Sequence, residues 1–262
     1  MFNIARIVFC SALAICLPAM AGIDGMPADA VPVVTVPALD YVQLDAEDVV
    51  REHSGLPPRF ALPTTTIITP GSHGLWERTS DERLRWRLRV SCENAMSMNL
   101  GFGRWTLPTS GSMTISTVRG DMAIRDFTAD DNRSHGELWT PVVPGNDALI
   151  TIEVDASQKR IVEDNVTLTS INAGYRWVHD LSRGSSESCN IDVMCPEANS
   201  WWNEIPSVGV YTLNGYLTCS GVMLNNTSQD QTPYFLTANH CGVTNGTCLL
   251  YTSDAADEGL GV

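Results

Sequence analysis

The residues best suited to acid–base chemistry lie at Asn239-His240-Cys241, directly after the run Phe235-Leu236-Thr237-Ala238. A histidine where a strand leaves the core can present a ring nitrogen to a cleft and act as a general base. Cys241 can clamp that strand end to Cys219, 22 residues earlier, and a bridge over such a loop contributes about 3 kcal/mol by chain-entropy estimates. The clamp would matter because a general base must stay within hydrogen-bond reach of its proton. A structural role, the commoner one for a lone histidine, stays open.

Zinc binding is a second alternative, with Cys189, Cys195, Cys219, His240 and Cys241 as the ligands. Zinc sites usually show short paired ligand spacings, whereas the cysteines here are scattered, and an adjacent histidine and cysteine rarely both reach one metal. We therefore expect no metal site and no other cofactor. Outside the first 21 residues the cysteines are Cys92, Cys189, Cys195, Cys219, Cys241 and Cys248.

Residues 1–21 are typical of an export signal. Arg6 precedes the apolar run Ile7–Leu17, which is too short to span a bilayer, and Pro18-Ala19-Met20-Ala21 supplies an Ala-x-Ala cleavage site. A lipoprotein anchored at Cys16 is the alternative, but the bulky Ile15 before it does not suit such a site. We expect a secreted protein, extracellular or periplasmic, in an oxidising compartment where cysteines pair.

The charge of the chain restricts its partners. The formal net charge is −14 over 262 residues, which argues against nucleic acid and against an anionic membrane as partner. The basic residues are unevenly placed, since Arg183 is the last of them and Lys159 is the only lysine.

The first half of the chain divides into two regions. Residues 22–70 are rich in proline, and this composition is typical of an extended linker, with a helical turn at 45–52. From Gly71 short strands are expected, and Leu84–Val90 alternates apolar and polar side chains as a half-buried strand does. The spacing predicts an antiparallel sandwich of roughly a hundred residues. The further strands are expected at 97–105, 113–118, 123–127, 136–140, 148–155 and 166–177.

A second β region follows the polar segment 180–187. Strands are expected at 208–213, 216–224 and 234–237, and Asn214-Gly215 is a strong signal for a tight turn between the first two. Residues 248–262 continue no strand pattern and resemble the peptide encoded by sequencing-adapter DNA, so we expect them to be a non-native tail.

Several sequence features of the second region occur together and in order. They are Cys189-Asn190-Ile191-Asp192-Val193-Met194-Cys195-Pro196-Glu197, Cys219-x-Gly221, and Tyr234-Phe235-Leu236-Thr237-Ala238-Asn239-His240-Cys241. Through them residues 189–242 resemble the start of the mature domain of bacterial lysyl endopeptidases, a group of chymotrypsin-like serine proteases. Asn239 also fits the lysyl endopeptidase pattern, whereas most other trypsin-like enzymes have alanine at this position. Residues 71–180 resemble the family's β-rich propeptide more loosely, through Trp86–Val90 and Leu138–Gly145.

The resemblance implies an all-β fold, with a β-sandwich-like propeptide at 71–183 and the N-terminal part of a chymotrypsin-like double β-barrel at 184–247. His240 matches the general base, which takes a proton from the serine and passes it to the leaving amine. Cys219 and Cys241 match the disulfide beside that base. Cys189 and Cys195 match cysteines whose partners lie further along the family's chain.

No segment after Cys241 resembles the Gly-Asp-Ser-Gly motif of the family. The catalytic aspartate and serine and the specificity pocket would lie downstream, so we expect a chain truncated before them and inactive as given. The intact parent would be a secreted serine endopeptidase zymogen that cleaves after lysine, or also arginine, through an acyl-enzyme. Its partners would be protein or peptide substrates, and we expect a monomer.

Removal of the propeptide is expected at Arg183, which lies in the polar segment, with Lys159 as the other basic candidate. Two other functions remain open. The sandwich could be a secreted binding module, or the chain could be a catalytically dead protease homologue that serves as a scaffold.

Overall fold

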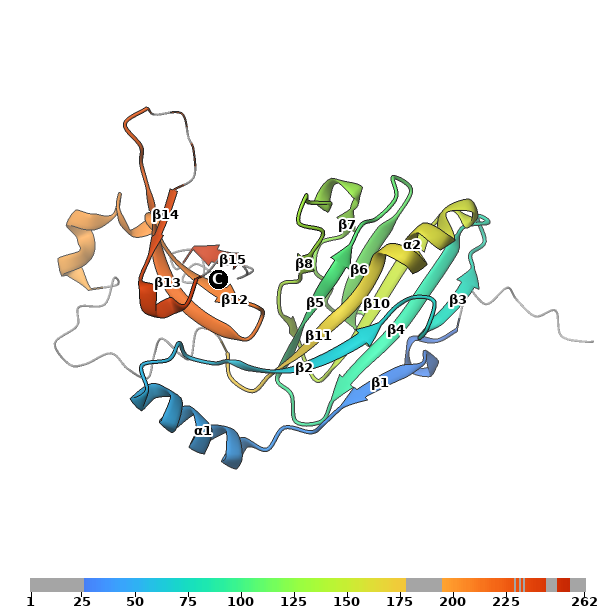
Figure 1. Cartoon of the computed structure of the whole chain (residues 1–262), viewed down its shortest axis with the longest axis horizontal. Helices are drawn as coiled ribbons and strands as arrows, with labels where there is room; N and C mark the ends of the chain where they lie inside the picture. Colours follow the sequence, from blue (N-terminus) through green and yellow to red (C-terminus); the bar gives the residue numbers. More distant parts are fainter. Residues whose placement is uncertain are drawn as a thin grey trace, which may run out of the picture.

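A computed structural model of the chain describes residues 26–177, 195–228, 230, 232, 234–243 and 249–254. The architecture is all-β, as the sequence predicts. Two sheets lie face to face within residues 26–177, and a separate four-stranded sheet follows within residues 208–254 (Figure 1). None of the helices in these ranges has the length and apolar character that crossing a membrane requires.

The first sheet of the sandwich has six strands in the order β1-β4-β10-β6-β7, with β3 also paired to β4. β1 runs parallel to β4, and the other pairs are antiparallel. Both β1 and β3 use the same edge of β4, because β1 pairs with its second half and β3 with its first. The strands are β1 (Val33–Val36), β3 (Leu75–Arg78), β4 (Leu84–Cys92), β6 (Ser112–Thr117), β7 (Phe127–Thr128) and β10 (Asp147–Val154).

The second sheet has five strands in the order β2-β11-β5-β8, with β9 also paired to β5. Its pairs are all antiparallel, and β2 lies at an edge. The strands are β2 (Ala61–Ile68), β5 (Ser97–Trp105), β8 (Leu138–Trp139), β9 (Val143–Pro144) and β11 (Val166–Gly174). The helices of this half are η1 (Ala28–Ala30), α1 (Tyr41–His53), η2 (Ala129–Asp131), η3 (Ala156–Gln158) and α2 (Lys159–Asn165).

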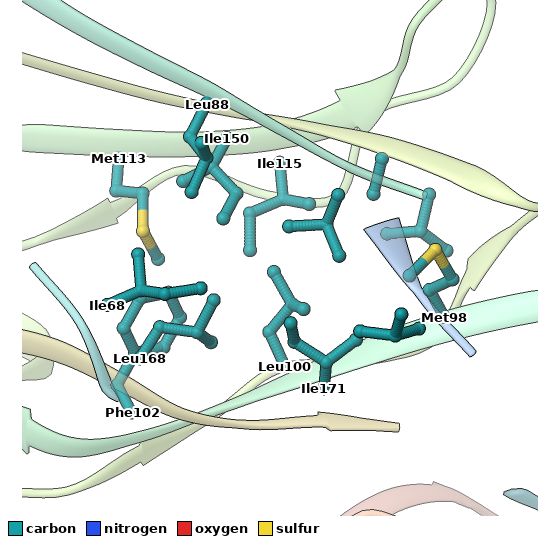
Figure 2. Close-up of a cluster of buried hydrophobic side chains, with 14 of the residues drawn as sticks. Ile68, Leu88, Met98, Leu100, Phe102, Met113, Ile115, Ile150, Leu168 and Ile171 are labelled. Atoms are coloured by element: carbon teal, nitrogen blue, oxygen red, sulfur yellow. The ribbon is translucent and has the colours of Figure 1, made fainter. Parts of the chain in front are cut away.

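The core of the sandwich lies between the two sheets. Figure 2 shows Leu88, Met113, Ile115 and Ile150 of the first sheet facing Leu100 and other apolar side chains of the second. These side chains are almost fully buried, and burying each large apolar side chain contributes about 1.5–3 kcal/mol. The alternation in the strands therefore produces the fold, because every second side chain enters this core.

The outward side chains of β4 are arginines that form ion pairs with neighbouring strands. Arg85 Nε lies 2.6 Å from Glu153 Oε1 of β10, and Arg87 Nη2 lies 2.5 Å from Glu77 Oε2 of β3. The strand predicted at 84–90 is thus confirmed, with an apolar face in the core and a paired cationic face outside.

The prediction of an extended linker at 22–70 is wrong. This region contributes β1 to one sheet and β2 to the other, and the helical turn predicted at 45–52 is part of the longer helix α1, whose first turn is capped by the Asp40 carboxylate. Proline is compatible with β2 because an edge strand has one unpaired side, where the missing N–H costs nothing. Pro63 lies in β2 opposite Asn172 of β11.

Other expectations for the sandwich need smaller corrections. The strand predicted at 123–127 is reduced to an isolated bridge between Ser116 and Ala123 and the short β7. The strand predicted at 136–140 is only the two residues of β8, and β3, β9 and α2 were not predicted. These are short elements held by tertiary contacts, which local periodicity does not reveal.

The second β region forms a four-stranded antiparallel sheet in the order β14-β13-β12-β15. Its strands are β12 (Val208–Leu213), β13 (Leu217–Leu224), β14 (Tyr234–Thr237) and β15 (Leu249–Asp254), preceded by η4 (Pro196–Trp201) and η5 (Ile205–Ser207). The tight turn at Asn214-Gly215 is confirmed, since both residues have positive φ angles, 52° and 74°. The expectation that no strand follows residue 248 is wrong, because β15 pairs with β12. That residues 248–262 are non-native stays a prediction.

Candidate active site

His240 lies in the middle of η6 (Asn239–Cys241), a short helical turn. One residue, Ala238, separates it from the end of β14. The histidine is exposed, whereas Cys241 beside it is buried. A disulfide joins Cys241 to Cys219 in β13. The predicted pairing is thus confirmed, and it fixes the exit of β14 to a neighbouring strand while the imidazole remains accessible.

Three hydroxyl and carbonyl groups support the strand end before His240. The Thr237 hydroxyl donates a hydrogen bond of 2.9 Å to the Ser220 carbonyl of β13. The Tyr211 hydroxyl of β12 lies 2.6 Å from Thr237 Oγ1, which also lies 3.3 Å from Cys241 Sγ. Strands β12, β13 and β14 therefore meet at Thr237, three residues before the histidine.

A small apolar cluster lies beneath this site. Tyr211, Leu213 and Cys241 are buried together, and the Phe235 ring meets Tyr211 edge-on with 5.3 Å between ring centres. Edge-to-face aromatic pairs at this distance are favourable by about 0.5–1.5 kcal/mol beyond area burial. The disulfide therefore packs against buried apolar side chains on one side.

Gly221 allows β14 to approach β13 closely. A Cβ built at this position would lie 2.5 Å from the Phe235 ring and 2.7 Å from the Leu236 carbonyl. Cys219, Ser220 and Gly221 lie inside β13, within the strand predicted at 216–224. A glycine within a strand pattern signals such a close approach, so this signal was present in the sequence.

Sequence reasoning also missed the roles of Tyr211 and Thr237. Both lie within strands whose bounds were predicted, but their contact joins positions 26 residues apart. No local pattern in the sequence indicates that two such hydroxyls meet.

The metal alternative concerns the same three residues. Ligand atoms of Cys219, His240 and Cys241 lie within 4.8 Å of one another. A zinc site of this type needs cysteine thiolates, and here the two sulfur atoms are bonded to each other. The arrangement therefore fits a clamped imidazole, and the residues do not offer a zinc ligand set in this oxidised form.

The remaining predicted residues lie away from His240 or outside the described part of the chain. Cys195, at the start of η4, has no disulfide partner among the described residues, and Lys159 is the first residue of α2 in the sandwich. Arg183 and Cys189 fall outside the described residues. Among the predicted site residues that the structure describes, it brings together His240, Cys219 and Cys241. The strands described form an open four-stranded sheet and do not close a barrel.

The comparison with known families agrees with this arrangement. Residues 183–254 match the family model described as "Lysyl endopeptidase, C-terminal domain". The matched range includes the disulfide, His240 and the first part of the segment expected to be a non-native tail. Over residues 183–254 the chain is therefore similar to the C-terminal domain of lysyl endopeptidases.

Proposed function

We propose that this chain belongs to an exported serine endopeptidase zymogen in which His240 is the general base. The observation that carries the proposal is an exposed histidine at a disulfide-clamped strand end inside a segment that matches the lysyl endopeptidase C-terminal domain. An export signal at residues 1–21 fits a secreted product, in whose compartment disulfides form.

The chemistry proposed for His240 is that of a Ser-His-Asp triad. Its free ring nitrogen takes the proton of a serine hydroxyl while the serine oxygen attacks the carbonyl carbon of the peptide. The imidazolium then gives that proton to the leaving amine, and water later hydrolyses the acyl-enzyme. We propose that both the serine and the aspartate are encoded further along the gene than His240.

Two other described residues, Asp230 and Ser220, have side chains of the types found in a triad. The Asp230 carboxylate accepts hydrogen bonds from Asn226 Nδ2 at 2.6 Å and from the Thr232 N–H at 3.0 Å. Ser220 lies within β13, where its carbonyl accepts from Thr237. The contacts of Asp230 support a structural role for its carboxylate, and we propose neither residue as a member of the triad.

The four-stranded sheet has apolar side chains on both of its faces, which supports the proposal that it is part of a larger barrel. Val208, Leu224, Tyr234 and Leu236 are exposed, although they are large and apolar. Cross-strand pairing places Leu224 opposite Tyr234, so these side chains share one face. The opposite face carries the cluster around Tyr211. A sheet that is apolar on both faces is typical of strands that are covered on both sides.

Cleavage after lysine is proposed from the description of the matched family. For propeptide removal, Arg183 is preferred to Lys159. The Lys159 ammonium lies 3.4 Å from Glu163 and over the Trp76 ring, within the helix between β10 of one sheet and β11 of the other. The family match begins at residue 183, which supports a junction there.

The proposal is tested on the product of the complete gene. Its coding region is read beyond codon 247, and the secreted protein is treated with a fluorophosphonate, which labels activated serines. We expect one labelled serine in a Gly-x-Ser-Gly segment after His240, and hydrolysis of lysyl amides in preference to leucyl amides. A coding region without such a segment, or an unlabelled and inactive product, would support the dead homologue instead.

A further inference from the structure

The tip of the β12–β13 hairpin lies on the sandwich, at one end of β5 and β11 (Figure 1). Asn99 Nδ2 of β5 donates a hydrogen bond of 2.7 Å to the Gly215 carbonyl, and both groups are buried. Asn172 Nδ2 of β11 donates to Asn99 Oδ1 at 2.8 Å. The two neighbouring side-chain amides lie on the outer face of the sheet. Asn172 orients the Asn99 amide, whose N–H then donates to the hairpin turn.

The fit between turn and sheet requires a glycine. A Cβ built on Gly215 would lie 2.3 Å from Asn99 Oδ1, 2.4 Å from Asn172 Nδ2 and 3.1 Å from the Trp139 ring. The φ angle of 74° at Gly215 also favours glycine. The turn is therefore complementary to the sheet in shape as well as in hydrogen bonding.

Backbone pairing continues the contact along one side of the hairpin. The Phe60 N–H donates to the Tyr216 carbonyl at 3.0 Å, and the Thr218 N–H donates to the Pro58 carbonyl at 3.0 Å. An antiparallel bridge joins Arg59 to Leu217 between them. The segment that precedes β2 thus adds to the hairpin as a short strand, in the manner of β-augmentation.

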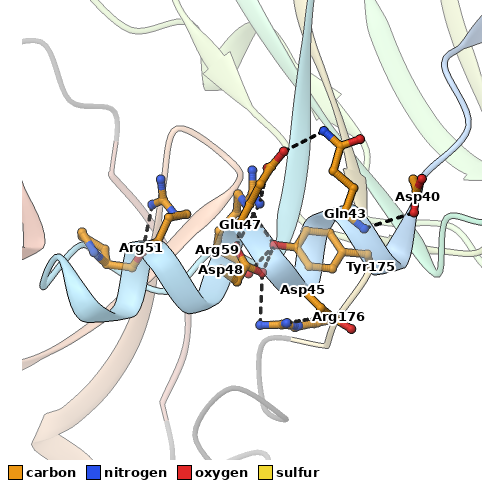
Figure 3. A network of polar contacts seen from close by, with 10 residues as sticks. Asp40, Gln43, Asp45, Glu47, Asp48, Arg51, Arg59, Tyr175 and Arg176 are labelled. Carbon is orange, nitrogen blue, oxygen red and sulfur yellow. Dashed lines mark hydrogen bonds and ion pairs between the residues drawn. The ribbon is translucent and has the colours of Figure 1, made fainter.

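The sandwich holds that segment in place without help from the hairpin. Figure 3 shows the Arg59 guanidinium among the acidic side chains of α1, with Nη2 3.0 Å from Glu47 and 2.9 Å from Asp48. Arg59 Nε also donates to the Tyr175 hydroxyl at 3.0 Å. The Tyr175 N–H donates to the Phe60 carbonyl. These groups all lie within residues 26–177, so the binding surface is preorganised.

We propose that residues 26–177 form a binding site for a two-residue hairpin turn with glycine at its second position, and that the occupant is the β12–β13 turn of the same chain. The site holds the hairpin non-covalently, so the two parts stay together after the connection at 178–194 is cut. His240 remains exposed in this arrangement. Cutting the connection and releasing the sandwich are therefore two separate steps, and this inference does not depend on the serine chemistry.

The test uses the full chain with a recognition site for a sequence-specific protease inserted between Arg183 and Gly184. After folding, the chain is cut and analysed by size-exclusion chromatography under native conditions. We expect both fragments to elute together at low micromolar concentration and to separate only in denaturant. Separate elution of the fragments without denaturant would overturn the proposal.

Two variants locate the contact. Gly215→Ala places a Cβ against Asn99 and Asn172. We expect the two fragments to associate more weakly by a factor on the order of ten or more, as for loss of a buried hydrogen bond and its packing. Gly120→Ala is the matched control, because Gly120 has a φ angle of 72° with nothing within 4 Å of its Cβ position, and it should elute as the parent does. Peptide mapping without reductant checks that Gly215→Ala retains the Cys219–Cys241 disulfide. Unchanged association of a disulfide-intact Gly215→Ala chain would contradict the site.

Discussion

The hydroxyl groups of Tyr211 and Thr237 lie 2.6 Å apart and join β12 to the strand end that precedes His240. The Thr237 hydroxyl has one proton, which it donates to the Ser220 carbonyl at 2.9 Å. Tyr211 is therefore the donor of the shorter contact. Two strands thus hold the last residue of β14 through one threonine oxygen.

Tyr211→Phe removes this donor and keeps the ring against Phe235. We expect the variant to lose about 1 kcal/mol of local stability, since a buried hydroxyl contact is lost without a new cavity. Amide hydrogen exchange should be faster at Thr237 and through η6. Tyr234→Phe is the control, because its ring is exposed. Equal protection of the β14 amides in Tyr211→Phe and in the unmodified chain would show that the hydroxyl pair does not hold the strand end.

The disulfide makes a separate prediction. Replacing both Cys219 and Cys241 by alanine opens a loop with a sequence separation of 22, and we expect a loss of about 3 kcal/mol in the unfolding free energy of this sheet. Cys195→Ala removes a cysteine that is free in the structure and should leave that free energy nearly unchanged. Chemical denaturation followed by tryptophan fluorescence measures both. A double variant as stable as the Cys195→Ala chain would refute the clamp.

Ionisation of Tyr175 is expected to lower the stability of the sandwich in the alkaline pH range. Burial, and then the hydrogen bond that its hydroxyl donates to Asp48 at 2.5 Å, raise the pKa of Tyr175 well above its ordinary value of 10.0. The unfolded chain ionises this phenol near pH 10 while the folded chain keeps it neutral. The free energy of unfolding should therefore fall as the pH rises above about 10.

Urea denaturation between about pH 8 and 11 tests this dependence. Tyr175→Phe should be less stable at neutral pH, because the bond to Asp48 is lost, but should lose less stability than the parent above pH 10. Tyr234→Phe should follow the parent curve. If Tyr175→Phe loses as much stability as the parent over this range, Tyr175 is not the group responsible.

The sequence predicted the regular strands well where alternation and turn residues agreed. Ser97–Trp105, Val208–Leu213 and Tyr234–Thr237 have the predicted bounds, because each has strand-forming residues between clear breaks. The turn at Asn214-Gly215 was also predictable, since few residues other than these adopt positive φ angles readily. The clamp around His240 was predicted through the family resemblance.

What local patterns could not predict are the contacts between distant segments. The proline-rich start was interpreted as a linker, although β2 tolerates Pro63 as an edge strand. The hydrogen bond from Asn99 to Gly215 joins residues 116 positions apart. Its asparagine looks like any outward-facing polar residue of a strand until the hairpin covers it. Such positions depend on how the sheets pack, which one strand alone does not encode.

The most direct measurement of the central claim is the rate of lysyl amide hydrolysis by the processed product of the complete gene, with and without His240. We predict that His240→Ala lowers kcat/KM by a factor on the order of 10⁴ or more, as loss of a triad base does. Asn239→Ala, in the neighbouring exposed position, should retain the disulfide and most of the activity. Hydrolysis by His240→Ala at the rate of the unmodified enzyme would contradict the assignment of this imidazole as the general base.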